Sequence, residues 1–176
     1  MKKKIFLSAG LLLVVVSLSL SACKKDNKAS STKSEKYRIV AGAWKQSDIV
    51  LGVAVSVKVG ATKYNFPAGT SVITDPILTA AGVTANFTST KNSVYRFSDS
   101  GSYRIDGVTT LILPVAGNKG RWSLDVYDAV LKLNPADTTN DPHWINAISD
   151  TSLALAMTVT IPGLGAAPLS LQLKKQ

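Results

Sequence analysis

Apolar and polar residues alternate over long stretches of this chain. From Ile49 to Val59 every odd position is apolar, and residues 153–161 and 169–173 repeat the same pattern. Successive side chains of a β-strand point to opposite faces, so a period of two predicts strands with one buried face. The first stretch is also rich in β-branched valine, which favours strands. We therefore expect one long strand over residues 49–59 and two more near the C-terminus.

Two residues before the first alternating stretch, residues 49–59, do not follow its odd-numbered pattern. Trp44 and Gln46 occupy even positions, whereas the apolar side chains that follow occupy odd ones. One extra residue in a strand shifts all later side chains to the other face. A β-bulge near Ser47 and Asp48 would bring Trp44 onto the same face as these apolar side chains, and we expect one there.

Shorter alternating segments fill the middle of the chain. Residues 93–97 and 102–106 flank Ser98-Asp99-Ser100-Gly101, an arrangement typical of a β-hairpin. Further strands are expected over residues 109–113, 121–127, 129–133 and 144–148. One short helix is expected after Asp75, because an acid, a proline at the first helical position and Gly82 past the end are helix start and stop signals.

These elements predict an all-β domain. There are about eight strands, the connections are mostly short, and the long crossovers of βαβ units are absent. Antiparallel up-and-down strands of this number close into a barrel, which leaves no exposed sheet edge. A two-sheet sandwich is the alternative. The hairpin-like connections favour the barrel.

The N-terminus carries a different pattern. Lys2, Lys3 and Lys4 precede an apolar run that ends at Leu20-Ser21-Ala22-Cys23. A cationic start, an apolar segment and small residues before a cleavage point are the features of a secretory signal. We expect a signal peptide over residues 1–22, a flexible tether over residues 23–36 that is too polar to bury a core, and the domain over residues 37–176.

Net charge changes this picture little. The formal charge of +9 includes the signal lysines and a lysine-rich tether, and the domain itself has twelve Lys and Arg against nine Asp and Glu. Its cations are scattered singly, whereas a nucleic-acid groove needs clustered cations with stacking aromatics. We expect no nucleic-acid partner.

Reactive side chains are few. Cys23 is the single cysteine, which excludes an intramolecular disulfide and a thiolate zinc site. His143 is the single histidine; Asp141 is near it, but no serine-elbow motif accompanies them, so we expect a loop histidine. Residues 137–141 carry oxygen ligands in the manner of any polar loop and lack the glycine and glutamate of an EF-hand. We predict no catalytic site, no metal and no cofactor, and hence no enzyme.

Several motifs together resemble a known family. They are Gly42-Ala43-Trp44-Lys45, residues 94–103, Gly120-Arg121-Trp122-Ser123-Leu124 and Trp144-Ile145. In this order they are similar to the lipocalin-like lipoproteins of Bacteroidota, and the similarity covers roughly residues 37–174. The resemblance implies a lipocalin- or calycin-like barrel in which Trp44 plugs one end. The arginine that covers this tryptophan in lipocalins has no clear counterpart in the sequence. Separately, Leu20-Ser21-Ala22-Cys23 resembles a bacterial lipoprotein lipobox, which implies that Cys23 is acylated, with chains such as palmitate. The alternative is that Cys23 is an ordinary small residue in a conventional signal.

The resemblance also implies a function. It suggests a lipid-anchored protein of the cell envelope, most simply of the outer membrane, that binds a small apolar molecule. The aromatic candidates for the cavity lining or for the core are Tyr95, Phe97, Tyr103, Trp122 and Trp144. The alternative is an accessory envelope protein whose filled barrel docks a protein partner. An integral outer-membrane barrel is disfavoured because aromatic girdles and a terminal aromatic residue are lacking.

Overall fold

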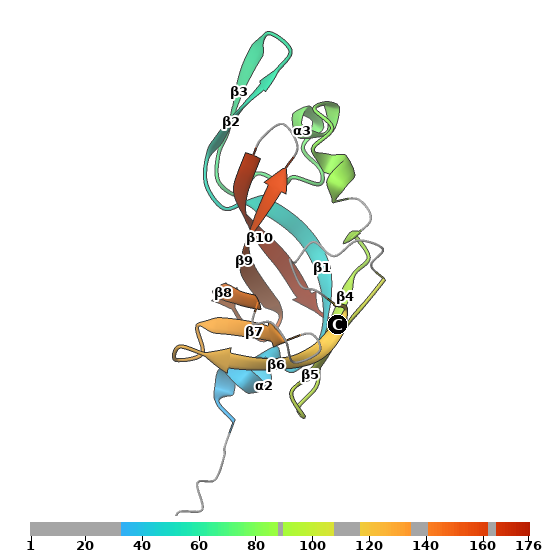
Figure 1. The fold of residues 1–176 in the computed structure, drawn as a ribbon, viewed down its shortest axis with the longest axis vertical. Coiled ribbons are helices and arrows are strands. Elements are labelled where there is room, and N and C mark those ends of the chain that lie inside the picture. Colours follow the sequence, from blue (N-terminus) through green and yellow to red (C-terminus); the bar gives the residue numbers. More distant parts are fainter. Residues whose placement is uncertain (1–32, 88–89, 108–116, 135–140, 162–164) are drawn as a thin grey trace, which may run out of the picture. The chain divides into compact units, whose positions relative to one another are not determined.

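The computed structural model describes residues 33–87, 90–107, 117–134, 141–161 and 165–176, which belong to one compact unit, Lys33–Gln176 (Figure 1). Eight antiparallel strands close into a barrel in the order β1-β10-β9-β8-β7-β6-β5-β4. They are β1 (Gly42–Leu51), β4 (Val94–Phe97), β5 (Ser102–Asp106), β6 (Lys119–Asp125), β7 (Val130–Asn134), β8 (Asp141–Ile148), β9 (Ser152–Ile161) and β10 (Gly165–Lys175). The predicted barrel is confirmed, and the sandwich is not formed.

The C-terminal strands follow the predicted alternation. β9 and β10 pair over ten consecutive residue pairs, from Gly165 opposite Ile161 to Lys174 opposite Ser152. Leu155 and Leu171 are directly opposite each other, and both are fully buried. The stripes of odd-numbered residues therefore form one wall of the core, as period-two burial requires.

The predicted bulge is present in β1. Pairing with β10 shifts between Gln46 and Asp48. As a result both Trp44 and Ile49 are fully buried, although one is at an even and the other at an odd position. The extra residue lets a single strand keep its apolar side chains on the core face on both sides of the bulge.

The expected long strand over residues 49–59 is wrong. β1 ends at Leu51, and β2 (Val55–Val59) pairs with β3 (Thr62–Phe66) in a separate two-stranded sheet. The chain turns at Gly52, whose N–H donates to Pro168 O over 2.9 Å. A Cβ at this position would lie 3.1 Å from that same oxygen. A larger residue would fit here only if the β10 backbone shifted slightly. The alternation resumes afterwards because β2 buries a face of its own.

Among the described residues there are two short α-helices, where one helix was expected, and a 3₁₀ helix, η2 (Thr84–Asn86). α3 (Pro76–Ala80) is the predicted helix, and the Asp75 carboxylate caps it by accepting from the N–H groups of Ile77 and Leu78. α2 (Glu35–Val40) begins inside the segment that composition assigns to the tether, where the Ser34 hydroxyl accepts from Tyr37 N–H over 3.0 Å. A lone serine cap in a polar segment is too weak a signal to predict it. None of the helices in the described ranges is long and apolar enough to cross a membrane.

Some expectations fall outside the described residues. These are the signal peptide and Cys23, the strand over residues 109–113, and all but the last residue of the 137–141 loop. They stay predictions from the sequence.

Candidate functional site

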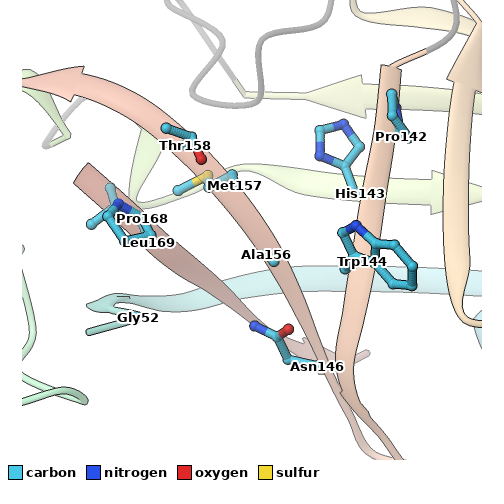
Figure 2. Close-up of a pocket in the computed structure, with 10 residues that line it drawn as sticks. All are labelled: Gly52, Pro142, His143, Trp144, Asn146, Ala156, Met157, Thr158, Pro168 and Leu169. Carbon is cyan, nitrogen blue, oxygen red and sulfur yellow. The ribbon is translucent and has the colours of Figure 1, made fainter. Parts of the chain in front are cut away.

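The barrel wall opens between β8 and β9. The two strands pair only from Ile145 opposite Leu155 to Ile148 opposite Leu153, with a shift of register after Ile145. The first half of β8 pairs with β7, and β9 beyond Leu155 pairs with β10. The strands therefore diverge on one side of this short contact, as Figure 2 shows.

A pocket of about 460 Å³ occupies this divergence, and we call it the seam pocket. Its walls come from β8, β9, β10 and the residue that follows β1. The lining residues are Gly52, Pro142, His143, Trp144, Asn146, Ala156, Met157, Thr158, Pro168 and Leu169.

The lining combines side chains from both faces of the wall. Met157 and Leu169 belong to the core and are 5% and 1% exposed. Trp144 and Pro168, by contrast, are exposed. Each is next to a buried residue of its strand, Trp144 to His143 and Pro168 to Leu169. Neighbouring positions on a strand point to opposite sides of the sheet, so the seam pocket extends from the outer surface to side chains of the core.

Trp144, which the sequence makes a candidate for the cavity lining or for the core, borders the seam pocket and lies outside the core. Its side chain is 57% exposed and lies on the outer face of β8, opposite Val130 of β7, which is 3% exposed. Paired residues share a face, so the two side chains are neighbours on the outer surface of the wall, and Trp144 borders the pocket. This residue is available to a ligand in a way that a core tryptophan is not.

His143 is also placed differently from the prediction. It lies within β8 instead of a loop, is 3% exposed and stands opposite Leu131, a fully buried core residue. Polar groups near the rim of the pocket are the Thr158 hydroxyl and the Asn146 amide, which donates to Ser170 Oγ over 3.4 Å. The described part of the chain holds no group of three or more His, Cys, Asp and Glu side chains that could bind a metal.

The other four aromatic candidates are packed in the core. Tyr95, Phe97, Tyr103 and Trp122 are each 2–3% exposed. The Phe97 and Trp122 rings meet edge to face with centroids 5.5 Å apart. Burial raises the pKa of the Tyr95 hydroxyl, because the charged form would lose its hydration. None of these four lines the seam pocket.

At the barrel end that α2 covers, by contrast with Trp144, the tryptophan is packed inside the protein. Trp44 is fully buried, and its indole N–H donates to Val40 O at the end of α2 over 2.7 Å. Tyr37 of α2 stacks on Trp122 with centroids 4.1 Å apart. Both contacts fix the helix across this end of the barrel.

A lysine covers the buried tryptophan. Lys175 Nζ lies 5.1 Å from the centre of the Trp44 ring and donates to Ile39 O over 3.0 Å. The two residues are opposite each other in the β1–β10 pairing. This is a cation–π contact. The sequence alone indicates no cationic residue that would cover Trp44. The sequence around Lys175 carries no signal that would pair it with residue 44.

Comparison with known proteins adds no relative: no protein-family model and no curated protein matches this chain.

Proposed function

We propose that this protein is a lipid-anchored component of the bacterial cell envelope, most simply of the outer membrane, and that its barrel binds a small, largely apolar molecule in the seam pocket. The anchor is supported by the order of charges, apolar run and small residues that ends at Cys23. The two parts are independent, and each has its own test.

The observation that carries the binding function is the composition of the seam pocket. Its volume of about 460 Å³ lies within the usual range of small-molecule sites, about 300–1,000 Å³. Such sites are mostly apolar with a few polar groups that orient the ligand. Here Met157 and Leu169 supply apolar surface, the Trp144 indole supplies a flat face, and Thr158 and Asn146 supply hydrogen bonds at the rim.

The test is to fill the pocket from its outer side. Ala156 lines the pocket and is half-buried, so Ala156→Phe places a ring in the ligand's space. Ala166 is exposed, on the next strand and outside the pocket, so Ala166→Phe is a matched control. The mature chain would be titrated with a panel of fatty acids, sterols and aromatic compounds, with tryptophan fluorescence and thermal unfolding as readouts.

A ligand present at about 100 times its dissociation constant stabilises a protein by about 2.7 kcal/mol. We expect this stabilisation in the unmodified chain and in Ala166→Phe, and its loss in Ala156→Phe. A panel that never shifts the unfolding temperature, or that shifts it equally in both variants, would rule out the seam pocket as the site.

The anchor is tested by Cys23→Ala. We expect the unmodified chain to incorporate a labelled fatty acid and to remain with membranes after a carbonate wash. The variant should lose the label and appear in the soluble fraction. Unchanged membrane association of the variant would contradict acylation as the means of attachment.

One observation favours docking of a protein partner as a second candidate function. Among the described strands, the part of β9 beyond Leu155 pairs with β10 on one side and with no strand on the β8 side. An extended peptide can add to such an edge through main-chain hydrogen bonds. Site-specific crosslinking in cells from position 158, with position 166 as the control, would separate this candidate from small-molecule binding.

A further inference from the structure

The turn between β6 and β7 adopts a backbone conformation that its residues disfavour. Val126, Tyr127 and Asp128 have φ angles of 51°, 55° and 61°. The left-handed region is unfavourable for side chains other than glycine, and a β-branched residue there is an outlier. Glycine or asparagine would relieve the strain, and tight hairpin turns usually carry them.

Local contacts hold this turn in place. The Asp125 carboxylate accepts from Val126 N–H over 2.8 Å and forms an ion pair with Lys132. The Ala129 N–H donates to both Asp125 O and Val126 O, each over 3.1 Å. The consequence is that two apolar side chains are presented to the outside: Tyr127 is 99% exposed and Val126 is 49% exposed.

A single exposed apolar residue needs no explanation, since apolar atoms make up much of any protein surface. This turn differs because exposure and backbone strain coincide in adjacent residues. Strained backbone persists where surrounding contacts over-determine it, and it gathers at functional sites. The side chains at the tip therefore point to a partner with an apolar surface.

The turn lies beside the point at which the chain enters the domain. Lys36 of α2 donates through Nζ to Asp128 O over 3.4 Å, and Figure 1 shows α2 next to β6. Lys33, just before α2, contacts the Asp99 carbonyl of the β4–β5 turn and lies over the Tyr37 ring. Lys36 thus contacts the turn that carries Val126 and Tyr127, and Lys33 contacts the β4–β5 turn.

The length of the tether limits how far this end lies from the anchor. Ten residues separate Cys23 from Lys33. Fully extended they span at most about 33–36 Å. A domain of this size has a radius of gyration of about 14 Å. The α2 end therefore stays close to the surface that holds Cys23.

We propose that the tip of the β6–β7 hairpin, Val126 and Tyr127, dips into the headgroup region of the bilayer that holds the lipid anchor. Tyrosine prefers this region because its ring is apolar and its hydroxyl remains hydrated. Val126 adds apolar surface beside it, and Lys33 and Lys36 interact with lipid phosphates. The contact orients the barrel with α2 toward the membrane. This inference rests on the proposed acylation of Cys23.

The test uses the full lipidated chain in vesicles of phosphatidylethanolamine with a smaller part of phosphatidylglycerol. A polarity-sensitive fluorophore is attached at Tyr127→Cys, and a second sample carries it at Lys63→Cys. Acylated Cys23 has no free thiol to compete for the label. Lys63 is an exposed residue of β3, and Figure 1 shows β2 and β3 at the end of the barrel away from α2. Tyr127 is fully exposed, so its replacement removes no packing.

We expect the label at position 127 to shift to the blue and to lose emission when lipids carrying a headgroup nitroxide are included. The label at position 63 should do neither. A chain that floats with the vesicles but shows an unquenched label at position 127 overturns the membrane contact and leaves the anchor intact. Protection of position 127 in cells, without quenching in vesicles, overturns it in favour of a protein partner. A chain that fails to float removes the acylation on which the contact depends.

Discussion

Two tryptophans of this barrel lie in opposite environments. Trp44 has no exposed surface, its N–H is bonded to α2 and a lysine covers its ring. Trp144 is 57% exposed and borders a pocket where two strands separate. The Trp44 indole makes its hydrogen bond and its apolar contacts within the protein, whereas the Trp144 indole leaves most of its surface to solvent. The α2 end is closed by contacts within the protein, and the seam leaves apolar surface exposed beside a pocket.

The largest expected effect is on stability at the α2 end. Trp44→Ala removes a buried indole and the contacts that hold Val40 of α2. Truncation of a buried tryptophan costs about 3–5 kcal/mol. Urea unfolding should show the loss as a lower midpoint with little change in slope. A loss below about 1 kcal/mol would mean that the two tryptophans do not differ as described.

Trp144→Ala should weaken ligand binding more than it lowers stability. The indole is more than half exposed, so we expect less than about 1 kcal/mol of destabilisation. Binding of any ligand found in the panel should weaken by about tenfold, because an aromatic contact contributes up to about 1.5 kcal/mol. Titration and unfolding of the same sample measure both. Equal ligand affinity in the variant would remove Trp144 from the site.

Lys175→Gln tests the cover on Trp44. The variant keeps a long polar side chain but loses the charge over the ring. Cation–π contacts at partly exposed sites contribute about 0.5–1 kcal/mol. We expect a loss of that size, and no comparable change for Lys174→Gln, which replaces an exposed neighbour on the same strand. Equal losses of stability in both variants would mean that the loss comes from the lower net charge and not from the contact with Trp44.

The smallest effect is confined to alkaline solution. Burial raises the folded-state pKa of Tyr95 above the ordinary tyrosine value of about 10. The neutral hydroxyl therefore contributes stability that is complete below about pH 10 and is lost as the pH rises toward the folded-state pKa. Tyr95→Phe should make the alkaline decline in the free energy of unfolding shallower, measured by urea unfolding at several pH values. An unchanged slope would show that the hydroxyl is hydrated in the folded protein.

Much of the fold could be predicted from local patterns. Alternation and a Gly-containing loop predict the hairpin over residues 93–106. Asp75, Pro76 and Gly82 predict α3. The bulge in β1 follows from the change of parity between Trp44 and Ile49. Each of these depends on residues close together in the chain, where propensity and periodicity act directly.

The failures share a different cause. Alternation over residues 49–59 could not show that the chain leaves the barrel at Gly52, because the reason is the carbonyl of Pro168, far along the chain. His143 was expected in a loop because it follows Pro142, and pairing with β7 places it in the wall instead. Periodicity reports which side of a strand is apolar and not which strand lies beside it.

For this protein the sequence by itself determined the all-β class, the alternation that fills the core, the capped helix α3 and the prediction of an acylated Cys23. The tertiary structure alone decided that β8 and β9 separate, that Trp144 lies outside while the other aromatic candidates lie inside, and that Lys175 covers Trp44. Side-chain period and capping are properties of neighbouring residues, whereas a gap in a barrel wall depends on which distant backbones form hydrogen bonds and where they stop.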